Sequence, residues 1–498
     1  MSETPPLLFS VNREDTRPMF EQLCDTIRHS VHRGVLTQNM TLPATRTLAQ
    51  ELAISRSTVV TAYEQLVAEG YLEGKPGAGY VVCAMGDTEL PVASSERKRS
   101  VAGSKDVSST AHKEGLLKPS LPDMRLFPHR LWARTVARVC RTHPESMLIG
   151  SDSFGYPELR RAIVDHVREW RGLEVSPHQV IVTAGATDAL NICFRTLLKP
   201  GQSVGLEDPG YRPILRQVTG LGLKPVFMDV DKEGAQLPDI GSPVDQDLAI
   251  NPQVESDQQL PAIVVLTPSH QYPLGNTMSP QRRWEYIHWA HQHGSWIIED
   301  DYDSEFRYAG RPIPAMAGLD QMNRILYTGS FAKIFSNTLR LGYLIVPDSL
   351  TESMRQTMAD FGLKASLMPQ PALAEFIHSG DFYRHLRRVR KTYSERNKYL
   401  VQQLNQRFSD SGQVQDYSAG MKLVFHLKQP FTDTDIVIRA NQAGLALGAL
   451  SESCQRRVDG NGLIMGFAGY NTEEIRQALD ILYEVISACQ TGREFYRE

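Results

Sequence analysis

The sequence has few of the features that mark disulfide-rich, metal-binding or membrane proteins. Its six cysteines lie far apart among 498 residues, form no Cys-x-x-Cys pair and have no histidine at metal-ligand spacing. No apolar run approaches the roughly 18–20 residues of a membrane span. The N-terminus also lacks a cationic start followed by an apolar core. We therefore expect a reduced, cytoplasmic protein with no membrane partner and no metal.

An excess of charge of one sign is also missing. The formal net charge is -4, so the chain as a whole is not attracted to nucleic acid, and a DNA-binding role needs a local cause. A content of 41% hydrophobic and 22% charged residues is typical of a globular protein, and 498 residues are too many for one ordinary domain. Composition therefore predicts several globular domains.

Two apolar runs end in chemically active side chains. The run that starts at Trp296 is expected to be a buried strand, and it ends in carboxylates and a tyrosine, including Asp300 and Tyr302. The run 324–328 is followed by Gly329-Ser-Phe-Ala-Lys333. A carboxylate and a lysine at neighbouring strand ends suggest a pyridoxal 5′-phosphate site. The lysine would form the Schiff base, and the carboxylate would keep the pyridine nitrogen protonated.

The first eighty residues have the pattern of three helices and a hairpin. Apolar residues recur every four positions from Met19 to Val31, and a second short helix is expected over 45–53. Ser55 is a natural N-cap for a third helix over 56–69, and a Gly/Pro turn divides a hairpin over 70–82. This order predicts a winged helix-turn-helix, with a three-helix protein-interaction module as the alternative.

In a winged helix-turn-helix, the N-terminal residues of the third helix would enter the major groove. Arg46 could hold a phosphate, and Lys75 on the wing could reach the DNA backbone or the minor groove. Tyr63 is counted here too, although the helical pattern turns it toward the core. The expected DNA contacts are Arg46, Ser55, Arg56, Ser57, Thr58, Tyr63 and Lys75.

The motifs of this region resemble the GntR-type DNA-binding domain over nearly all of residues 12–82. They are Leu42-Pro-Ala-Thr-Arg-Thr-Leu-Ala-Gln-Glu-Leu52, Ser55-Arg-Ser-Thr-Val59, Glu69-Gly-Tyr-Leu72 and Gly77-Ala-Gly79. The resemblance implies double-stranded operator DNA as a partner. After it, residues 83–118 are polar, small and poor in aromatics, which predicts a flexible linker.

From residue 119 to 498, strand-like runs alternate with helical stretches, which predicts a largely parallel sheet covered on both faces. The strand, small-residue turn and helix start of 180–190 would suit a phosphate. Tyr211 follows another strand and could stack on a flat ring, and residues after the strand at 264–266 add polar groups.

This C-terminal part resembles the fold-type I aminotransferases, and the whole chain resembles the MocR/GabR family of regulators. The resemblance implies an all-α winged helix-turn-helix joined to an α/β pyridoxal-phosphate-dependent transferase fold. That fold has a large domain with a mixed, mostly parallel sheet, a smaller C-terminal α+β subdomain, and a role in homodimer formation. It implies Lys333 as the Schiff-base residue, with these residues around the cofactor: Asp300, Tyr302, Arg340, Ser330, Gly185, Ala186, Thr187, Tyr211, His270 and Gln271.

Four departures from the family pattern bear on activity. Thr187-Asp188 replaces a pair of glutamines, Ala332 replaces a serine before the lysine, and 147–155 lacks a tyrosine. Ile464 stands where aminotransferases carry the arginine that binds the substrate carboxylate. Arg212 or Arg457 could substitute for that arginine, but full transamination becomes doubtful without it.

The resemblance therefore favours a transcription regulator that senses an amine or amino acid through aldimine exchange at Lys333. One alternative is an active aminotransferase with an accessory DNA-binding domain. Another is a DNA-binding protein whose second domain only forms the dimer.

Overall fold

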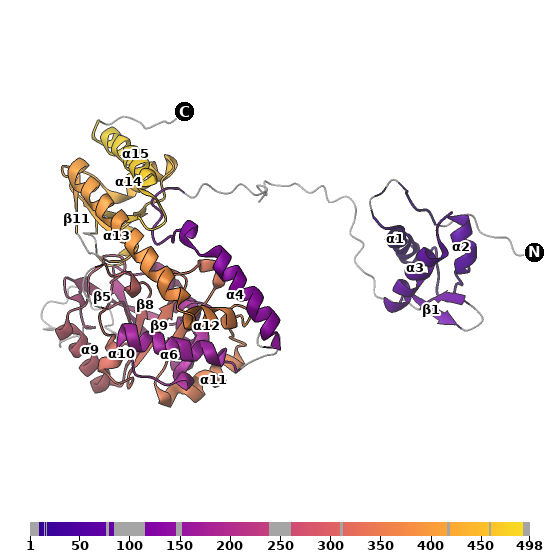
Figure 1. The fold of residues 1–498 in the computed structure, drawn as a ribbon, viewed down its shortest axis with the longest axis horizontal. Coiled ribbons are helices and arrows are strands. Elements are labelled where there is room, and N and C mark those ends of the chain that lie inside the picture. The colour runs from indigo at the N-terminus through magenta and orange to yellow at the C-terminus, as the bar shows by residue number, and fades with distance from the viewer. Residues whose placement is uncertain are drawn as a thin grey trace, which may run out of the picture. The chain divides into compact units, whose positions relative to one another are not determined.

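The computed structural model describes residues 9–13, 15, 17–75, 79–83, 115–145, 152–238, 260–308, 312–415, 419–457 and 460–491. The chain forms two compact units, Met1–Ser108 and Ser109–Glu498. Both are drawn in Figure 1. Residues 84–114 of the expected linker, the wing turn at 76–78 and the segment 146–151 lie outside the described residues. No described helix is long and apolar enough to cross a membrane.

The first unit is a winged helix-turn-helix, as predicted. Its apolar positions are buried in one core, in which Ile27 of the first helix and Val59 and Leu66 of the third are fully covered. The two strands pair antiparallel, with Leu72 opposite Val82. The elements are α1 (Met19–His32), α2 (Thr45–Glu51), α3 (Arg56–Ala68), β1 (Leu72–Lys75) and β2 (Gly79–Val82).

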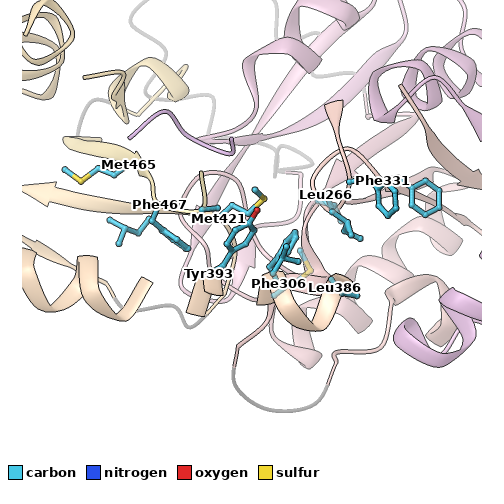
Figure 2. Packing of buried hydrophobic residues seen from close by; sticks show 14 of the residues in the cluster. Leu266, Phe306, Phe331, Leu386, Tyr393, Met421, Met465 and Phe467 are labelled. Atoms are coloured by element: carbon cyan, nitrogen blue, oxygen red, sulfur yellow. The ribbon is translucent and has the colours of Figure 1, made fainter. Parts of the chain in front are cut away.

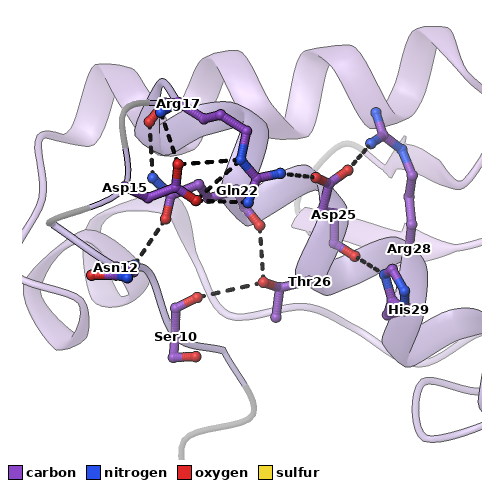
Figure 3. Close-up of polar contacts among 9 residues, drawn as sticks. All are labelled: Ser10, Asn12, Asp15, Arg17, Gln22, Asp25, Thr26, Arg28 and His29. Carbon is purple, nitrogen blue, oxygen red and sulfur yellow. Dashed lines mark hydrogen bonds and ion pairs between the residues drawn. The ribbon is translucent and has the colours of Figure 1, made fainter. Parts of the chain in front are cut away.

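Ion pairs join the start of α1 to the preceding loop and to the end of α3. Arg17 pairs with Asp15 (2.7 Å) and Asp25 (3.1 Å), and Figure 3 shows its guanidinium between the two acids. Arg28 pairs with Asp25 (2.6 Å) and with Glu69 at the end of α3 (2.7 Å). Because these pairs are largely exposed, they orient the helices more than they stabilise them.

The second unit is built on a large mixed sheet and a smaller antiparallel sheet. The large sheet has the order β3-β10-β9-β8-β7-β4-β5-β6, and the small one has the order β11-β12-β14-β13. The strands are β3 (Val180–Thr183), β4 (Ser203–Asp208), β5 (Lys224–Asp231), β6 (Gly234–Ala235), β7 (Ile263–Leu266), β8 (Trp296–Asp301), β9 (Ile325–Ser330), β10 (Gly342–Ile345), β11 (Gly412–Val414), β12 (Lys422–Leu427), β13 (Gly448–Ala449) and β14 (Gly462–Gly466). The helices are α4 (His129–Thr142), α6 (Pro157–Arg171), α7 (Ala186–Leu197), α8 (Arg212–Gly220), α9 (Pro280–His293), α10 (Met316–Leu319), α11 (Thr351–Asp360), α12 (Gln370–His378), α13 (Asp381–Arg407), α14 (Asp433–Gln442) and α15 (Thr472–Thr491).

Helices cover both faces of the large sheet, so its strands are apolar on both sides. In β7, Val264 belongs to one buried cluster and Val265 to the other. Ile297 and Ile298 of β8 divide in the same way. This follows from the two-residue period of a strand, and it explains why the run reads as continuously hydrophobic.

One buried cluster joins the large sheet to the small one. Figure 2 shows it passing from Phe331 beside the large sheet, through Phe306 and Tyr393, to Met465 and Phe467 at the small sheet. The 27-residue helix α13 supplies Tyr393 and lies alongside both parts (Figure 1). The two parts of this unit therefore share one core.

Residues 115–118, expected to belong to the linker, are part of the second unit. Leu116 forms a bridge with Leu445, and its amide donates to Gly444 O (3.0 Å). Leu117 is fully buried and accepts a hydrogen bond from the amide of Gly466. The expected linker boundary at 118 is therefore too late, because residues 115–118 are hydrogen-bonded to the second unit at Gly444, Ala446 and Gly466.

Candidate functional site

Several predicted residues meet where the parallel strands of the large sheet end. Strands β4, β7, β8 and β9 run parallel, so their carboxyl ends lie at one edge. Asp300 on β8 is opposite Thr328 on β9, and Lys333 follows β9 by three residues. The loop with His270 and Gln271 follows β7. This edge is the candidate cofactor site.

Asp300 differs from its two neighbours in having no cationic partner among the described residues. Glu299 and Asp301 both face the buried Arg171, at 3.5 and 2.8 Å. Asp301 also accepts a hydrogen bond from the hydroxyl of Tyr327. Asp300 points to the other face of the strand, and its buried Oδ1 accepts no hydrogen bond from the described residues.

Burial without a partner changes the protonation of Asp300. Desolvation, together with the negative charges of Asp301, Glu207 and Asp303, raises the pKa of its carboxyl from 3.8 to about 7. A carboxylate in such a position needs a cationic donor. The protonated pyridine nitrogen of a pyridoxal cofactor would be such a donor.

Tyr302 belongs to a polar network beside Asp300. Its hydroxyl lies 3.2 Å from His270 Nδ1, and that nitrogen lies 2.9 and 3.1 Å from the carboxylate oxygens of Asp303. The His270 ring packs so closely on Gly420 that a Cβ there would lie 2.2 Å from it. The network therefore places the Tyr302 hydroxyl firmly.

Lys333 is partly buried, and its amine makes a long hydrogen bond. Its Nζ donates to the backbone carbonyl of Ser120 at 3.2 Å. Burial lowers the pKa of the amine, while the charge of Asp303 partly opposes this effect. A lysine with a lowered pKa has more of its amine neutral at pH 7, which is the form that attacks a carbonyl carbon.

The predicted phosphate residues lie at the same edge of the sheet. Gly185 has φ +107° and precedes α7, so the free amides of Ala186 and Thr187 begin that helix. Ser330 is paired with Gly342, which is paired with Thr183 just before the Gly185 turn. Arg340 follows Lys333 by seven residues, and its side chain is exposed.

Asp188, the acid that would repel a phosphate, is turned away from the helix start. Its Oδ2 accepts a hydrogen bond from the amide of Ala184 at 2.8 Å. The carboxylate therefore stabilises the turn before α7, and the first amides of the helix remain free of it.

Tyr211 and Gln271 differ in how much they can offer a ligand. Tyr211 is 46% exposed and lies edge-on to Tyr272, with ring centroids 5.1 Å apart. Burial raises the pKa of the Tyr211 hydroxyl, and the charge of Asp300 adds to this effect, which indicates that the two residues are near each other. Gln271 is buried, and its amide donates to Pro209 O and accepts from Leu274 N. Its polar atoms hold the loop.

Sequence reasoning missed three groups at this site. Lys422 of β12 donates to the Tyr302 hydroxyl at 3.0 Å, and Tyr272 lies beneath its amine. Asp303 orients His270, and buried Glu207 accepts from Thr267 N and Gln271 Nε2. A lysine within the apolar strand 421–427 was the available signal for the first of these.

These residues fit pyridoxal 5′-phosphate. The unpartnered Oδ1 of Asp300 suits the ring nitrogen, Lys333 the carbonyl carbon, and the Gly185 turn with Ser330 the phosphate. When bound, the cofactor supplies an electrophilic carbon and an electron-withdrawing ring. Tyr302 would orient the ring through its hydroxyl, and Tyr211 would cover one of its faces.

The first unit presents its own polar surface at the start of α3. Ser55 caps the helix by accepting from Thr58 N (3.1 Å), and its hydroxyl lies 2.7 Å from those of Ser57 and Thr58. Arg56 at the first helical position is exposed, and so are Arg46 and Lys75.

Tyr63, expected among the DNA contacts, is placed in the core. Its side chain is fully buried, and its hydroxyl donates to Pro43 O at 3.0 Å. It therefore holds the loop before α2 and has no surface to offer DNA. The helical spacing of the sequence already predicts that Tyr63 faces the core.

Two protein families match the two units. Residues 20–82 match the bacterial regulatory proteins of the gntR family, and residues 131–481 match aminotransferase class I and II. The chain is 33% identical to the probable rhizopine catabolism regulatory protein MocR of Rhizobium meliloti, over 97% of this chain and 96% of that protein. It is 30% identical to the pyridoxine biosynthesis transcriptional regulator PdxR of Corynebacterium glutamicum, over 97% and 99%.

Solved structures support the fold of the second unit. An archaeal alanine:glyoxylate aminotransferase superposes with a TM-score of 0.67 and 23% identity, over 75% of this chain and 90% of that one. The α-aminoadipate aminotransferase LysN of Thermus thermophilus superposes with a TM-score of 0.66 and 22% identity, over 76% of this chain and 92% of that one. The second unit thus has the fold of the type I aminotransferases, and the chain belongs to the MocR-type transcriptional regulators, which join a GntR-type DNA-binding domain to an aminotransferase-like domain.

Proposed function

We propose that this regulator binds pyridoxal 5′-phosphate through Lys333 and senses an amine or amino acid that competes with Lys333 for the cofactor. The observation that carries the proposal is the buried, unpartnered Oδ1 of Asp300 at the same sheet edge as Lys333. Burial makes ionisation of this carboxyl unfavourable in the cofactor-free protein, as its raised pKa shows. A cationic ring nitrogen beside it would stabilise the ionised form.

The first unit binds double-stranded operator DNA in this proposal, with Arg56 in the major groove and Arg46 on the phosphates. The second unit forms a homodimer, so two DNA-binding units read paired half-sites in the cytoplasm. The effector controls DNA binding only if it binds one arrangement of the protein better than another. A tenfold bias requires roughly 1.4 kcal/mol of differential binding.

The test follows the cofactor and the DNA in the same samples. Protein loaded with pyridoxal 5′-phosphate is titrated with amines and amino acids while the visible spectrum of the cofactor is recorded. Fluorescence anisotropy then measures affinity for DNA that the protein has selected from a random-sequence library.

The expected result is at least one compound that changes both the spectrum and the DNA affinity of the wild type. The same compound should change neither in the Lys333→Ala protein. If compounds change the cofactor spectrum but none of them changes the DNA affinity, the sensing role is overturned. Repeated turnover of amino donor and keto acceptor, unaffected by deletion of 1–82, would favour an aminotransferase instead.

A further inference from the structure

Lys422 is a buried cation at the start of β12 in the small sheet. The residue is 3% exposed, and its Nζ reaches the Tyr302 hydroxyl at 3.0 Å. The amine also lies 4.5 Å from the ring centroid of Tyr272 and 4.7 Å from that of Tyr302. A lysine of the small sheet thus extends into the candidate cofactor site on the large sheet.

The amine of Lys422 has a neutral hydrogen-bond partner, while the nearby acid is already engaged. Asp303 is near enough for its charge to raise the pKa of Lys422, but its two carboxylate oxygens lie at 2.9 and 3.1 Å from His270 Nδ1. Burial, together with the charge of Lys333, lowers the pKa of Lys422 to about 8. At pH 7 the amine is mostly protonated, and its contacts among the described residues are two tyrosines, Tyr302 and Tyr272, so this buried cation is costly.

The strand register places this lysine on the same face of the small sheet as Ile464. Lys422 is opposite Gly466 on β14, and Val424, two residues on, is opposite Ile464. Opposed residues of an antiparallel pair share a face, as do residues two apart. Lys422 and Ile464 therefore lie on one face of the small sheet, although Gly466 itself is covered by the backbone of Lys118 and Pro119. His426 lies on the same face, but burial lowers its pKa, so Lys422 is the cationic side chain that β12 and β14 place there.

The two other cations considered for an acidic ligand are placed differently. Arg457 Nη1 donates to Val230 O at 3.0 Å. Arg212 is about half exposed and lies 4.0 Å from Glu452. Lys422 is the one of the three that is buried and in direct contact with a predicted cofactor residue.

We propose that Lys422 binds the acidic group of the effector, so the preferred effector is an amino acid and not a simple amine. The inference rests on the proposed function and adds the chemical class of the ligand. An effector whose amine replaces that of Lys333 and whose carboxylate meets Lys422 contacts both sheets of the second unit. Binding would then favour one arrangement of the two sheets, as sensing requires.

The test compares amino acids with their own decarboxylated amines. Three pairs serve as probes: alanine and ethylamine, phenylalanine and phenethylamine, and lysine and cadaverine. For each compound, the concentration that gives the half-maximal change in the cofactor spectrum is measured, together with the shift in melting temperature. The variants are Lys422→Met, which keeps the length without the charge, Lys422→Arg, which keeps the charge, and Arg212→Met as the matched control.

For the wild type we expect at least one pair in which the amino acid acts at a concentration roughly ten to a hundred times lower than its amine, the effect of a charge-assisted contact. Lys422→Met should remove this ratio; the lost contact with Tyr302 affects both members of a pair alike, so the ratio within one variant isolates the role of the carboxylate. Lys422→Arg and Arg212→Met should keep it. Three outcomes would overturn the assignment of Lys422. They are an equal response to both members of every pair, a ratio that persists in Lys422→Met, and a ratio that is lost in Arg212→Met. A protein that responds to no probe would instead overturn the proposed function.

Discussion

Asp300 and Asp301 are adjacent on β8 but lie in opposite electrostatic surroundings. Asp301 is 2.8 Å from the guanidinium of Arg171, whereas Oδ1 of Asp300 is buried without a partner among the described residues. The two-residue period of the strand causes the difference, because it directs Asp301 to the arginine and Asp300 to the candidate cofactor site.

Asp300→Asn should stabilise the cofactor-free protein as pH rises. The folded-state pKa of Asp300 is raised from 3.8 to about 7, so its contribution to stability is present below about pH 4 and is lost as pH rises through 7. Between about pH 5 and 8 the gain from Asp300→Asn should grow by up to roughly 2–3 kcal/mol, at about 1.4 kcal/mol per pH unit. Chemical unfolding at both pH values measures it.

Asp301→Asn is the matched control for that experiment. It removes the ion pair with Arg171 and leaves a buried arginine with less charge compensation, so it should destabilise the fold at both pH values. Asp300→Asn should also reduce the stabilisation that added cofactor gives, because the ring nitrogen loses its anionic partner. If the free energy of unfolding of wild type and Asp300→Asn had the same pH dependence, the pKa of Asp300 would not be raised in the folded protein.

Borohydride reduction should attach pyridoxal phosphate permanently to Lys333. The site holds a second buried lysine, and burial lowers the pKa of both amines, so the chemistry alone does not choose between them. Position favours Lys333, because its Nζ contacts a carbonyl at 3.2 Å within the described part of the chain, whereas Lys422 is held by Tyr302. Peptide mass spectrometry identifies the labelled residue. Lys333→Ala should lose the label and Lys422→Met should keep it; the reverse pattern would exchange their roles.

Tyr63→Phe should weaken the first unit without changing its DNA contacts. The substitution removes the hydrogen bond to Pro43 O from a fully buried side chain, which should cost about 1 kcal/mol. Hydrogen exchange of α3 amides in the full chain measures the loss of stability. DNA affinity well below the folding midpoint should remain that of the wild type. A specific loss of DNA affinity in a fully folded protein would return Tyr63 to the DNA surface.

The fold and the position of the site could be predicted because their signals are local. Continuous apolar runs mark strands buried on both faces, and Ser55 before Arg56 marks the start of α3. Parallel strands end at one edge, so Asp300 and Lys333 could be assigned to one site from their places after two runs.

Contacts between distant segments could not be predicted. Lys422 reaches Tyr302 across 120 residues and from another sheet, and no local pattern indicates that approach. The pairing of Leu116 with Leu445 is another contact between distant segments. The short segment around Leu116 is flanked by polar residues, and its local sequence does not indicate that it pairs with residue 445. For Tyr63 the helical pattern was informative, and counting the residue as a DNA contact ignored it.

Arg56 and Arg46 should affect DNA binding in different ways. Arg56 is exposed at the first position of α3, where a side chain reads base edges, so Arg56→Ala should cost about 1–3 kcal/mol on the selected operator and relax its sequence preference. Arg46 near the start of α2 should contact phosphate. Arg46→Ala should therefore weaken binding to all sequences alike and reduce the slope of log affinity against log salt by about 1.

Arg33→Ala is the control for both variants, because Arg33 is an exposed arginine at the far end of α1. Titrations of selected and scrambled DNA at several salt concentrations separate the two effects. If Arg56→Ala reduced affinity equally for both DNA sequences, its role would be that of a phosphate contact. If Arg33→Ala had the same effect as Arg46→Ala, the positive charge of the domain as a whole would matter more than the face formed by α2 and α3.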